Sequence, residues 1–373
     1  MRVVVDGRPF VKRATGVATC LRDTIRAICI YLPDWELILA LPKPIHRSIT
    51  DLPLDKIEVV VMPVINGLSV PNFIWYHIKF PFIACKMKAD LIWGTNTELP
   101  IISVGNSKRL ITICDVVWKE FKETMTASAQ FINIPFLDNS VMNADFIYNI
   151  SKYTQERIEH YFPKRKCTEM IAGISCSTLY QKRSISNEKR KSILEEFCLS
   201  EKFVLFVGSL EPRKNLLYLM KLMPEIYNKT GAKLLVVGGK GWKSNNIHTL
   251  FDENPAIKQS VVFANYVSFD MLVDLYNIAT VYVSTSLNEG FGLPQLEAMK
   301  CGCPVISPHN SAMIEVVEGR GITIEGWDEQ IWINKIVEVL TNDDYRESLC
   351  HPDLSDFDWK NIVLRLDNYI KRV

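Results

Sequence analysis

The hydrophobic pattern of this chain switches repeatedly between two periods. Short continuous apolar runs are typical of parallel strands buried on both faces, whereas apolar residues spaced three or four apart are typical of helices. The pattern predicts strands at residues 3–7, 35–41, 57–62, 90–93, 109–115, 146–150, 203–208, 233–238, 261–263 and 281–283. It predicts helices at residues 15–31, 151–161, 269–277 and 359–370, with others beginning near Leu216 and at Pro294.

Strands and helices therefore alternate through both halves of the chain. This order predicts an α/β fold of two facing, Rossmann-like, doubly wound parallel sheets, with ligands at their carboxyl edges. We expect a first domain over residues 1–180 and a second over residues 200–357. Between them, apolar content falls and charges crowd at residues 177–200, which we interpret as a linker with a surface helix. The amphipathic tail, about 358–373, is expected to cross back onto the first domain.

One segment, residues 71–88, is rich in aromatic residues and gathers lysines at its end. Two interpretations fit it. A helix broken at Pro81 that packs on the sheet is favoured, because the strand at residues 90–93 follows at once. The alternative is a segment that lies in a membrane interface.

Composition adds little to this picture but excludes several classes. The chain has 373 residues, of which 48% are hydrophobic and 23% charged, as expected for a globular enzyme of two domains. Its formal charge of +1 gives no electrostatic reason to expect nucleic acid as a partner. Residues 1–180 have a balance of +4 and the remainder −3. This asymmetry fits ordinary surface variation, or a first half that meets anionic lipid head groups.

The cysteines and histidines point to a reduced, metal-free protein. Ten cysteines occur singly, apart from Cys301 and Cys303, without a C-x-x-C pair or a secretory signal. We therefore expect a cytoplasmic location. The six histidines lack zinc-ligand spacing, so a dedicated metal site is not expected. Since no apolar run is long enough to cross a bilayer, any membrane contact is expected to be peripheral.

Candidate chemistry concentrates in residues 284–306, which read as strand end, glycine-rich turn, helix, turn and strand. Gly290 and Gly292 permit close backbone approach, and a proline at Pro294 suits the first turn of a helix. The N–H groups of the turn would point above the sheet with the positive helix end behind them. Glu289 and Glu297 flank the turn. Together they predict a site for a polyol or a phosphate.

Two motifs then carry a resemblance to a known family. The run from Glu289 to Glu297 reads EGFGLPQLE, and the loop at residues 211–215 reads EPRKN. At these motifs the chain resembles the retaining GT-B glycosyltransferases of glycosyltransferase family 4, of the group 1 type that includes bacterial O-antigen mannosyltransferases. Thr15-Gly16, the strand end at Ile113 to Asp115 (apart from Cys114) and the glycine turn at residues 239–242 also look like the family's, so the likeness extends over nearly the whole chain.

The resemblance implies roles for individual residues. Glu289 would contact donor-sugar hydroxyls, Glu297 the nucleoside ribose, and Arg213 with Lys214 the diphosphate. The remaining predicted contacts are the backbone of Gly290, Phe291, Gly292 and Leu293, the Gly16 loop over the diphosphate, and Tyr266 and Val267 beside the base. Tyr266 and Val267 fit plain core packing equally well, and Gly16 fits a helix cap.

Cys114 departs from the family pattern, which often has histidine at this position. A neutral thiol gives no comparable hydrogen bond to a donor sugar. Asp115 is predicted either to orient the acceptor or to cap the next loop. The D-x-D at Asp356 and Asp358 is interpreted as a helix cap rather than a metal ligand, so we expect no cofactor and no metal.

Taken together, the resemblance implies a cytoplasmic enzyme at the inner face of the membrane. It would move a hexose from a nucleotide diphosphate sugar, with GDP-mannose the first choice, to a lipid-linked glycan in surface polysaccharide or O-antigen synthesis. A UDP-hexose donor is the rival. A homologue that binds the nucleotide sugar without turnover is the alternative from another class, with Cys114 in its favour.

Overall fold

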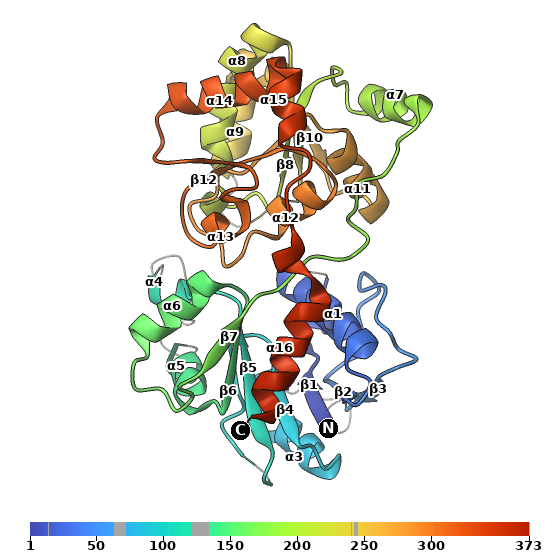
Figure 1. The fold of residues 1–373 in the computed structure, drawn as a ribbon, viewed down its shortest axis with the longest axis vertical. Helices are drawn as coiled ribbons and strands as arrows, with labels where there is room; N and C mark the ends of the chain where they lie inside the picture. Colours follow the sequence, from blue (N-terminus) through green and yellow to red (C-terminus); the bar gives the residue numbers. More distant parts are fainter. Residues whose placement is uncertain are drawn as a thin grey trace. The chain divides into compact units, whose positions relative to one another are not determined.

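The computed structural model describes residues 1–13, 15–62, 72–103, 105–120, 134–239, 241 and 245–372. They form two compact units (Figure 1): Met1–Ser175 with Asp356–Val373, and Cys176–Ser355. Each unit is built on one parallel sheet with helices between its strands, which confirms the predicted α/β fold class. The charged segment at residues 177–200 belongs to the second unit.

The first unit carries a seven-stranded sheet in the order β3-β2-β1-β4-β5-β6-β7. The order reverses beside β1, because β2 and β3 lie on one side of it and β4 on the other. Ligands of open parallel sheets bind where the order reverses, outside the carboxyl ends of the strands. The strands are β1 (Arg2–Asp6), β2 (Glu36–Leu41), β3 (Glu58–Val61), β4 (Leu91–Gly94), β5 (Lys108–Ile113), β6 (Phe146–Asn149) and β7 (Met170–Ala172).

Several helices of this unit begin where the sequence predicts. Helix α1 (Gly16–Tyr31) is capped by the Thr15 hydroxyl, and α6 (Lys152–Tyr161) by the Ser151 hydroxyl. Both caps satisfy a backbone N–H of the first turn that has no partner inside the helix. Two helices fall outside the prediction, α4 (Val117–Glu120) and α5 (Ile134–Asn143).

The predicted break at Pro81 is wrong. Helix α2 (Asn72–Ile74) continues through a π-helical turn (Trp75–Lys79) into α3 (Phe80–Lys86), and Pro81 lies in the first turn of α3. A proline removes one helical hydrogen bond and crowds the preceding turn. The wider π turn just before Pro81 accommodates this without interrupting the helix.

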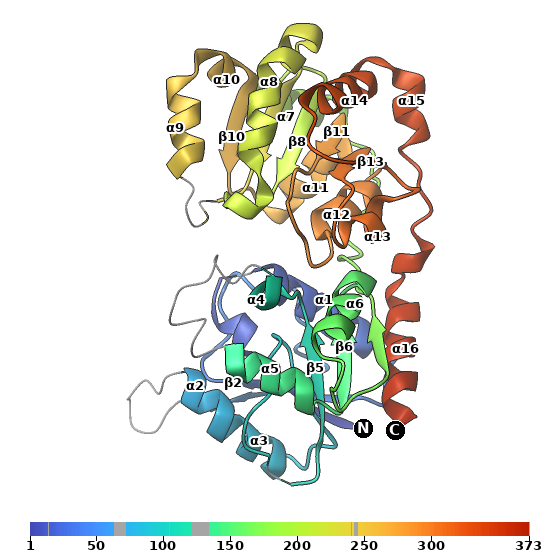
Figure 2. The same ribbon diagram turned by 90° about the vertical axis from the view of Figure 1, so that its left-hand side faces the viewer.

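The tail folds back onto the first unit, as predicted. Helix α16 (Trp359–Lys371) lies beside α1, and Figure 2 shows it along the edge of that unit. The indole of Trp35 donates a 2.8 Å hydrogen bond to Asp367. The hydroxyl of Tyr369 accepts one from the backbone of Ile147 and donates one to the carbonyl of Glu169. The last helix is therefore part of the first unit's core.

The second unit carries a six-stranded sheet in the order β10-β9-β8-β11-β12-β13. Its order reverses between β8 and β11. The strands are β8 (Phe203–Val207), β9 (Lys233–Val237), β10 (Val261–Asn265), β11 (Val281–Val283), β12 (Val305–Pro308) and β13 (Ile322–Ile324). The loops after β8 and β11 therefore meet at the point where a ligand is expected.

The core of this unit lies between the sheet and two long helices, α8 (Leu216–Thr230) and α14 (Glu329–Thr341). Leu219, Met223, Trp332 and Ile336 pack against the sheet. The remaining helices are α7 (Asn187–Glu196), α9 (Asn245–Glu253), α10 (Pro255–Ser260), α11 (Phe269–Ile278), α12 (Leu293–Lys300), α13 (Met313–Val317) and α15 (Asp343–Ser348). Within the described ranges, no helix is both long and apolar enough to span a bilayer.

Candidate active site

A partly buried cluster of two carboxylates and two cations lies where the strand order of the second unit reverses. Arg213 and Lys214 both pair with Glu289, and Arg213 also pairs with Glu211 at 3.0 Å. Glu289 follows β11, whereas Arg213 and Lys214 follow β8. Glu289 accepts a 2.8 Å hydrogen bond from Arg213 on one oxygen, and bonds from Lys214 and from the Ser286 hydroxyl on the other. The structure thus joins three predicted catalytic residues that are about 75 positions apart in the sequence.

The cluster fixes the charge of Glu289. Burial disfavours ionisation of this carboxyl, but the charges of Lys214 and Arg213 outweigh burial and lower its pKa to about 2. Glu289 is therefore a carboxylate at neutral pH. It can accept hydrogen bonds but has no proton to donate.

The loop after β8 owes its shape to contacts with the loop after β11. Pro212–Lys214 form a 3-10 turn, and Asn215 adopts a left-handed conformation before α8 begins. The Thr285 hydroxyl bonds the carbonyls of Lys214 and Asn215, and the backbone N–H of Leu287 donates to the carbonyl of Arg213. These bonds hold the two cations at the edge of the sheet.

The glycine-rich turn leads directly into α12. Gly292 precedes the helix with a φ of +110°, a conformation that side-chain-bearing residues rarely adopt, and Pro294 lies in the first turn. Phe291 is buried and anchors the turn. Gly290 to Leu293 therefore form the approach to the helix N-terminus, as predicted from their spacing, and their role toward a ligand stays a prediction.

Glu297 lies on the buried side of α12. Its carboxylate accepts a 3.0 Å hydrogen bond from the hydroxyl of Tyr276 on α11. Burial and the neighbouring Glu297 charge raise the pKa of Tyr276 well above its ordinary value, so this phenol stays a donor. The bond fixes one oxygen of Glu297.

Tyr266 and Val267 follow β10, on the outer side of the same edge. Tyr266 is 61% exposed, which excludes the core-packing interpretation for this side chain, and Val267 is half-buried. The Tyr266 ring covers Gly239, where an added Cβ would lie only 2.3 Å from a ring carbon. An exposed aromatic face on a glycine backbone is a suitable stacking surface for a base. Of the predicted glycine turn, Lys240 and Trp242 lie outside the described residues.

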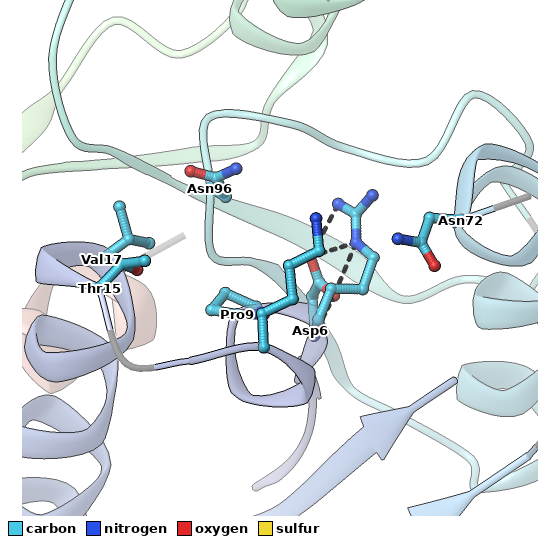
Figure 3. A pocket seen from close by; sticks show the side chains of 8 residues that line it. Asp6, Pro9, Thr15, Val17, Asn72 and Asn96 are labelled. Atoms are coloured by element: carbon cyan, nitrogen blue, oxygen red, sulfur yellow. Dashed lines mark hydrogen bonds and ion pairs between the residues drawn. The ribbon is translucent and has the colours of Figure 1, made fainter. Parts of the chain in front are cut away.

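The first unit has its own pocket where its strand order reverses, between β1 and β4 (Figure 3). The cavity measures about 260 Å³ and is lined by Asp6, Arg8, Pro9, Lys12, Thr15, Val17, Asn72 and Asn96. Gly16 lies at its rim, as the first residue of α1 between Thr15 and Val17. The predicted contact residue Gly16 thus borders a polar cavity.

Arg8 is locked in this pocket by two acids. Its guanidinium bonds both oxygens of Asp6 at 2.9 to 3.1 Å and Glu98 at 2.9 Å, and it stacks on the ring of Tyr76. Burial opposes the charge of Arg8, but Asp6, Tyr76 and Glu98 together outweigh burial and raise its pKa. This pairing was not identified from the sequence.

Cys114 and Asp115 follow β5. Burial raises the pKa of the Cys114 thiol well above its ordinary value, so the side chain is neutral at physiological pH. Asp115 is half-buried. Both interpretations of Asp115, acceptor contact and loop cap, are compatible with this position.

Three polar contacts of the site escaped the sequence analysis. Ser286 bonds the side chain of Glu289, the Ser311 hydroxyl accepts from the Glu289 backbone at 3.0 Å, and Tyr276 bonds Glu297. Ser286 lies in the predicted site stretch at residues 284–306, and Ser311 lies shortly after it. No charge distinguished them, so only the folded geometry identifies them.

Asp358 caps α16 by accepting a 2.7 Å hydrogen bond from the backbone of Lys360, as predicted. Over the part of the chain that the structure describes, no three His, Cys, Asp or Glu side chains are grouped to hold a metal ion.

Comparison with known proteins agrees with this geometry. Residues 201–342 match the family model described as Glycosyl transferases group 1. The matched region contains the Glu289 cluster, both switch-point loops and α12. The chain is therefore similar to glycosyl transferases of group 1 over most of its second unit.

Individual relatives narrow the class. The chain is 28% identical to O-antigen chain mannosyltransferase B of Escherichia coli over 242 residues, which cover 63% of this chain and 62% of that protein. Among solved structures, sucrose-phosphate synthase from Thermosynechococcus elongatus has a TM-score of 0.75 at 18% identity and covers the whole chain and 98% of its own. Anabaena HepE in complex with UDP-glucose also has a TM-score of 0.75, at 16% identity, with both chains fully covered. These neighbours establish the GT-B fold.

Proposed function

We propose that the protein is a retaining glycosyltransferase of glycosyltransferase family 4 that binds a nucleotide diphosphate sugar in its second unit. The observation that carries the proposal is the cluster of Glu289 with Arg213 and Lys214. It lies after the carboxyl ends of the adjacent strands β8 and β11, where the strand order reverses. Carboxylates bind pairs of sugar hydroxyls, and cations bind phosphate oxygens. In this cluster the carboxylate and the two cations are in direct contact, so one ligand can reach both kinds of group.

The same cluster accounts for catalysis of transfer. Negative charge grows on the diphosphate as the bond to the sugar breaks, and fixed cations stabilise that charge in the transition state. Arg213 and Lys214 would provide this stabilisation, together with the N–H groups before α12. In this proposal the reaction is metal-independent, because two side chains neutralise the leaving group.

Retention needs no protein nucleophile in the mechanism implied by the resemblance. The departing phosphate would help to deprotonate an acceptor that attacks from the same face of the sugar. Glu289, with its pKa lowered to about 2, would then bind sugar hydroxyls as a carboxylate and take no part in proton transfer. Glu297 would hold the ribose, and Tyr266 with Val267 would border the base.

We propose GDP-mannose as the donor. The support is the likeness to O-antigen chain mannosyltransferase B, whose name states a mannosyl transfer. A UDP-hexose is the second candidate, supported by the structural likeness to HepE bound to UDP-glucose. The third candidate, a non-catalytic binding protein, is supported by Cys114 in place of the family histidine.

The acceptor would be a lipid-linked glycan in surface polysaccharide synthesis, used at the inner face of the membrane by a cytoplasmic, peripherally bound enzyme. The pocket in the first unit fits an acceptor or phosphate group chemically. Lys12, Asn72 and Asn96 line it with hydrogen-bond donors beside the Arg8–Asp6 pair, and Gly16 opens a helix at its rim.

The test is transfer of radiolabelled mannose from GDP-mannose, or glucose from UDP-glucose, to lipid-linked saccharides without added metal. We expect one donor to be consumed with formation of a lengthened glycan, and Glu289→Ala to abolish this. Tight donor binding with no product for any acceptor would favour the non-catalytic alternative. Wild-type turnover in Glu289→Ala would overturn the site assignment.

A further inference from the structure

The helical segment 72–86 has two apolar faces, and the fold uses only one of them. Trp75, Tyr76, Phe80 and Ile83 are buried against Val4, Ile38 and Ile92 of the sheet. The other face carries Phe73, Ile74, Ile78 and Phe82, all exposed. The contrast is sharpest between Phe80, with no exposed surface, and Phe82, which is 56% exposed.

Two further apolar side chains extend this exposed face. Ile101 and Ile102 are exposed in the loop between β4 and β5. The backbone N–H of Ile101 bonds the ring of His77, which is in the π turn, so the loop lies beside the helix. We call Phe73, Ile74, Ile78, Phe82, Ile101 and Ile102 the apolar patch. Contiguous exposed patches of this kind mark interaction sites.

Basic side chains outnumber acidic ones around the patch, with five Lys or Arg against Asp90 and Glu98 in residues 72–109. Residues 72–89 contain three lysines and no Asp or Glu, and residues 99–109 contain Lys108 and Arg109 and again no acid. Lys79 and Lys86 lie three residues before and four after Phe82, which places them on the same helix face. Lys86, Lys88 and Lys108 are exposed.

We propose that the apolar patch is the surface by which the first unit docks on an anionic lipid bilayer. Phe82, Ile78 and the neighbouring side chains would enter the boundary between head groups and acyl chains, while the lysines bind lipid phosphates. The proposal extends the membrane partner of the proposed function by naming the residues that hold it. Binding to lipid is measured without turnover, so the two proposals fail separately.

Charge argues for lipid over a second copy of the chain. Pairing two identical patches face to face would bring two sets of lysines together, and residues 72–89 contain no acid to offset them. Figure 2 shows α2 and α3 on the periphery of the first unit. The apolar side chains of the patch are exposed there, as insertion into an interface requires. The inner face of this helix packs on the sheet, as one sequence interpretation of residues 71–88 expects. Its outer face carries the exposed apolar side chains that the membrane interpretation needs.

The experiment is flotation of the full chain with vesicles of phosphatidylcholine alone or mixed with phosphatidylglycerol. We expect binding only to the anionic vesicles, weakening with salt. Ile78→Ser with Phe82→Ser should reduce binding about tenfold or more, and Lys86→Glu should reduce it several-fold. Matched controls are Ile30→Ser, which alters an isoleucine that is 58% exposed on α1, and the exposed Lys164→Glu. Both should bind as the wild type does.

Each other outcome overturns the proposal. Absence of wild-type binding to anionic vesicles would do so, as would equal binding by Ile78→Ser/Phe82→Ser. Sedimentation that shows a dimer broken by this double change would assign the patch to a second copy instead. Thermal unfolding of every variant checks that the first unit is folded. Donor binding, measured in parallel, should stay unchanged throughout.

Discussion

At the residue scale, the site depends on a carboxylate whose charge is fixed by its neighbours. Glu289 is conspicuous in the sequence because it opens a glycine-rich turn, but its pairing with Arg213 and Lys214 depends on strand order. The sequence indicates which residues carry charge. It does not give the distances between loops that follow different strands, and these distances decide whether the charges compensate one another.

The charge of Glu289 predicts a pH-dependent stability. Its pKa is lowered from 4.5 to about 2 in the folded chain, so the ionised form stabilises folding above about pH 4.5. This contribution is lost as pH falls toward 2. Glu289→Gln should therefore be about 2 to 3 kcal/mol less stable than the wild type at pH 7. The difference should shrink steadily below pH 4.5.

Urea unfolding of both proteins at a series of pH values measures this difference. Glu347→Gln is the matched control, because Glu347 is exposed and pairs with His351 at the surface. It should change stability by less than about 0.5 kcal/mol at any pH. A pH-independent gap between wild type and Glu289→Gln would show that the carboxylate is not stabilised by the two cations.

At the element scale, strands and helices were predicted correctly where a cap or an apolar run lies within the element's own residues. Thr15, Ser151 and Asp358 each cap the predicted helix, because a cap needs only its own next few residues. The π turn before Pro81, β7, β13 and α14 were not predicted. Short edge strands of three residues carry too little pattern, and α14 is defined by packing on α8.

A substitution at Gly16, at the start of α1, can test a structural role and a ligand-binding role separately. An added Cβ would meet nothing within 4 Å, and its φ is not in the left-handed region. Gly16→Ala should leave the free energy of unfolding unchanged or raise it by up to about 1 kcal/mol. If the loop approaches the donor phosphate as proposed, transfer should nevertheless fall at least about tenfold.

Thermal unfolding and initial rates at saturating donor measure both effects in one protein. Gly292→Ala is the contrasting variant, because its φ of +110° makes any side chain strained. It should lose about 1 to 2 kcal/mol of stability. Full activity of Gly16→Ala would remove Gly16 from the predicted contact residues and leave it as a helix start.

At the scale of the whole molecule, the chain is two units of one architecture, and its last helix belongs to the first. The fold class was predicted because strand and helix signals alternate in both halves. The apolar tail was expected to cross back, and α16 supplies buried contacts to α1 and β7. The pocket chemistry of the first unit was not predicted, because Arg8, Asn72 and Asn96 come from segments far apart in the sequence.

The contacts of α16 predict that a substitution in this helix lowers the stability of the first unit alone. Tyr369→Phe removes a hydroxyl that accepts from the Ile147 backbone and donates to Glu169, leaving a buried N–H without a partner. The first unit should lose about 1 to 3 kcal/mol, while donor affinity in the second unit stays unchanged. Calorimetry with and without donor separates the two effects. Leu364→Ala, at an exposed position of the same helix, should change stability little.

The central claim is that the second unit binds a nucleotide diphosphate sugar through Arg213, Lys214 and Glu289. Thermal unfolding in GDP-mannose, UDP-glucose and ADP-glucose tests it most directly, because a ligand stabilises only the state that binds it. We predict that one donor raises the melting temperature by about 5 °C or more at saturation, and we expect that donor to be GDP-mannose. Lys214→Met should abolish the shift, and Lys221→Met, at an exposed lysine on α8, should retain it. No shift with any nucleotide sugar, or a full shift in Lys214→Met, would contradict the account.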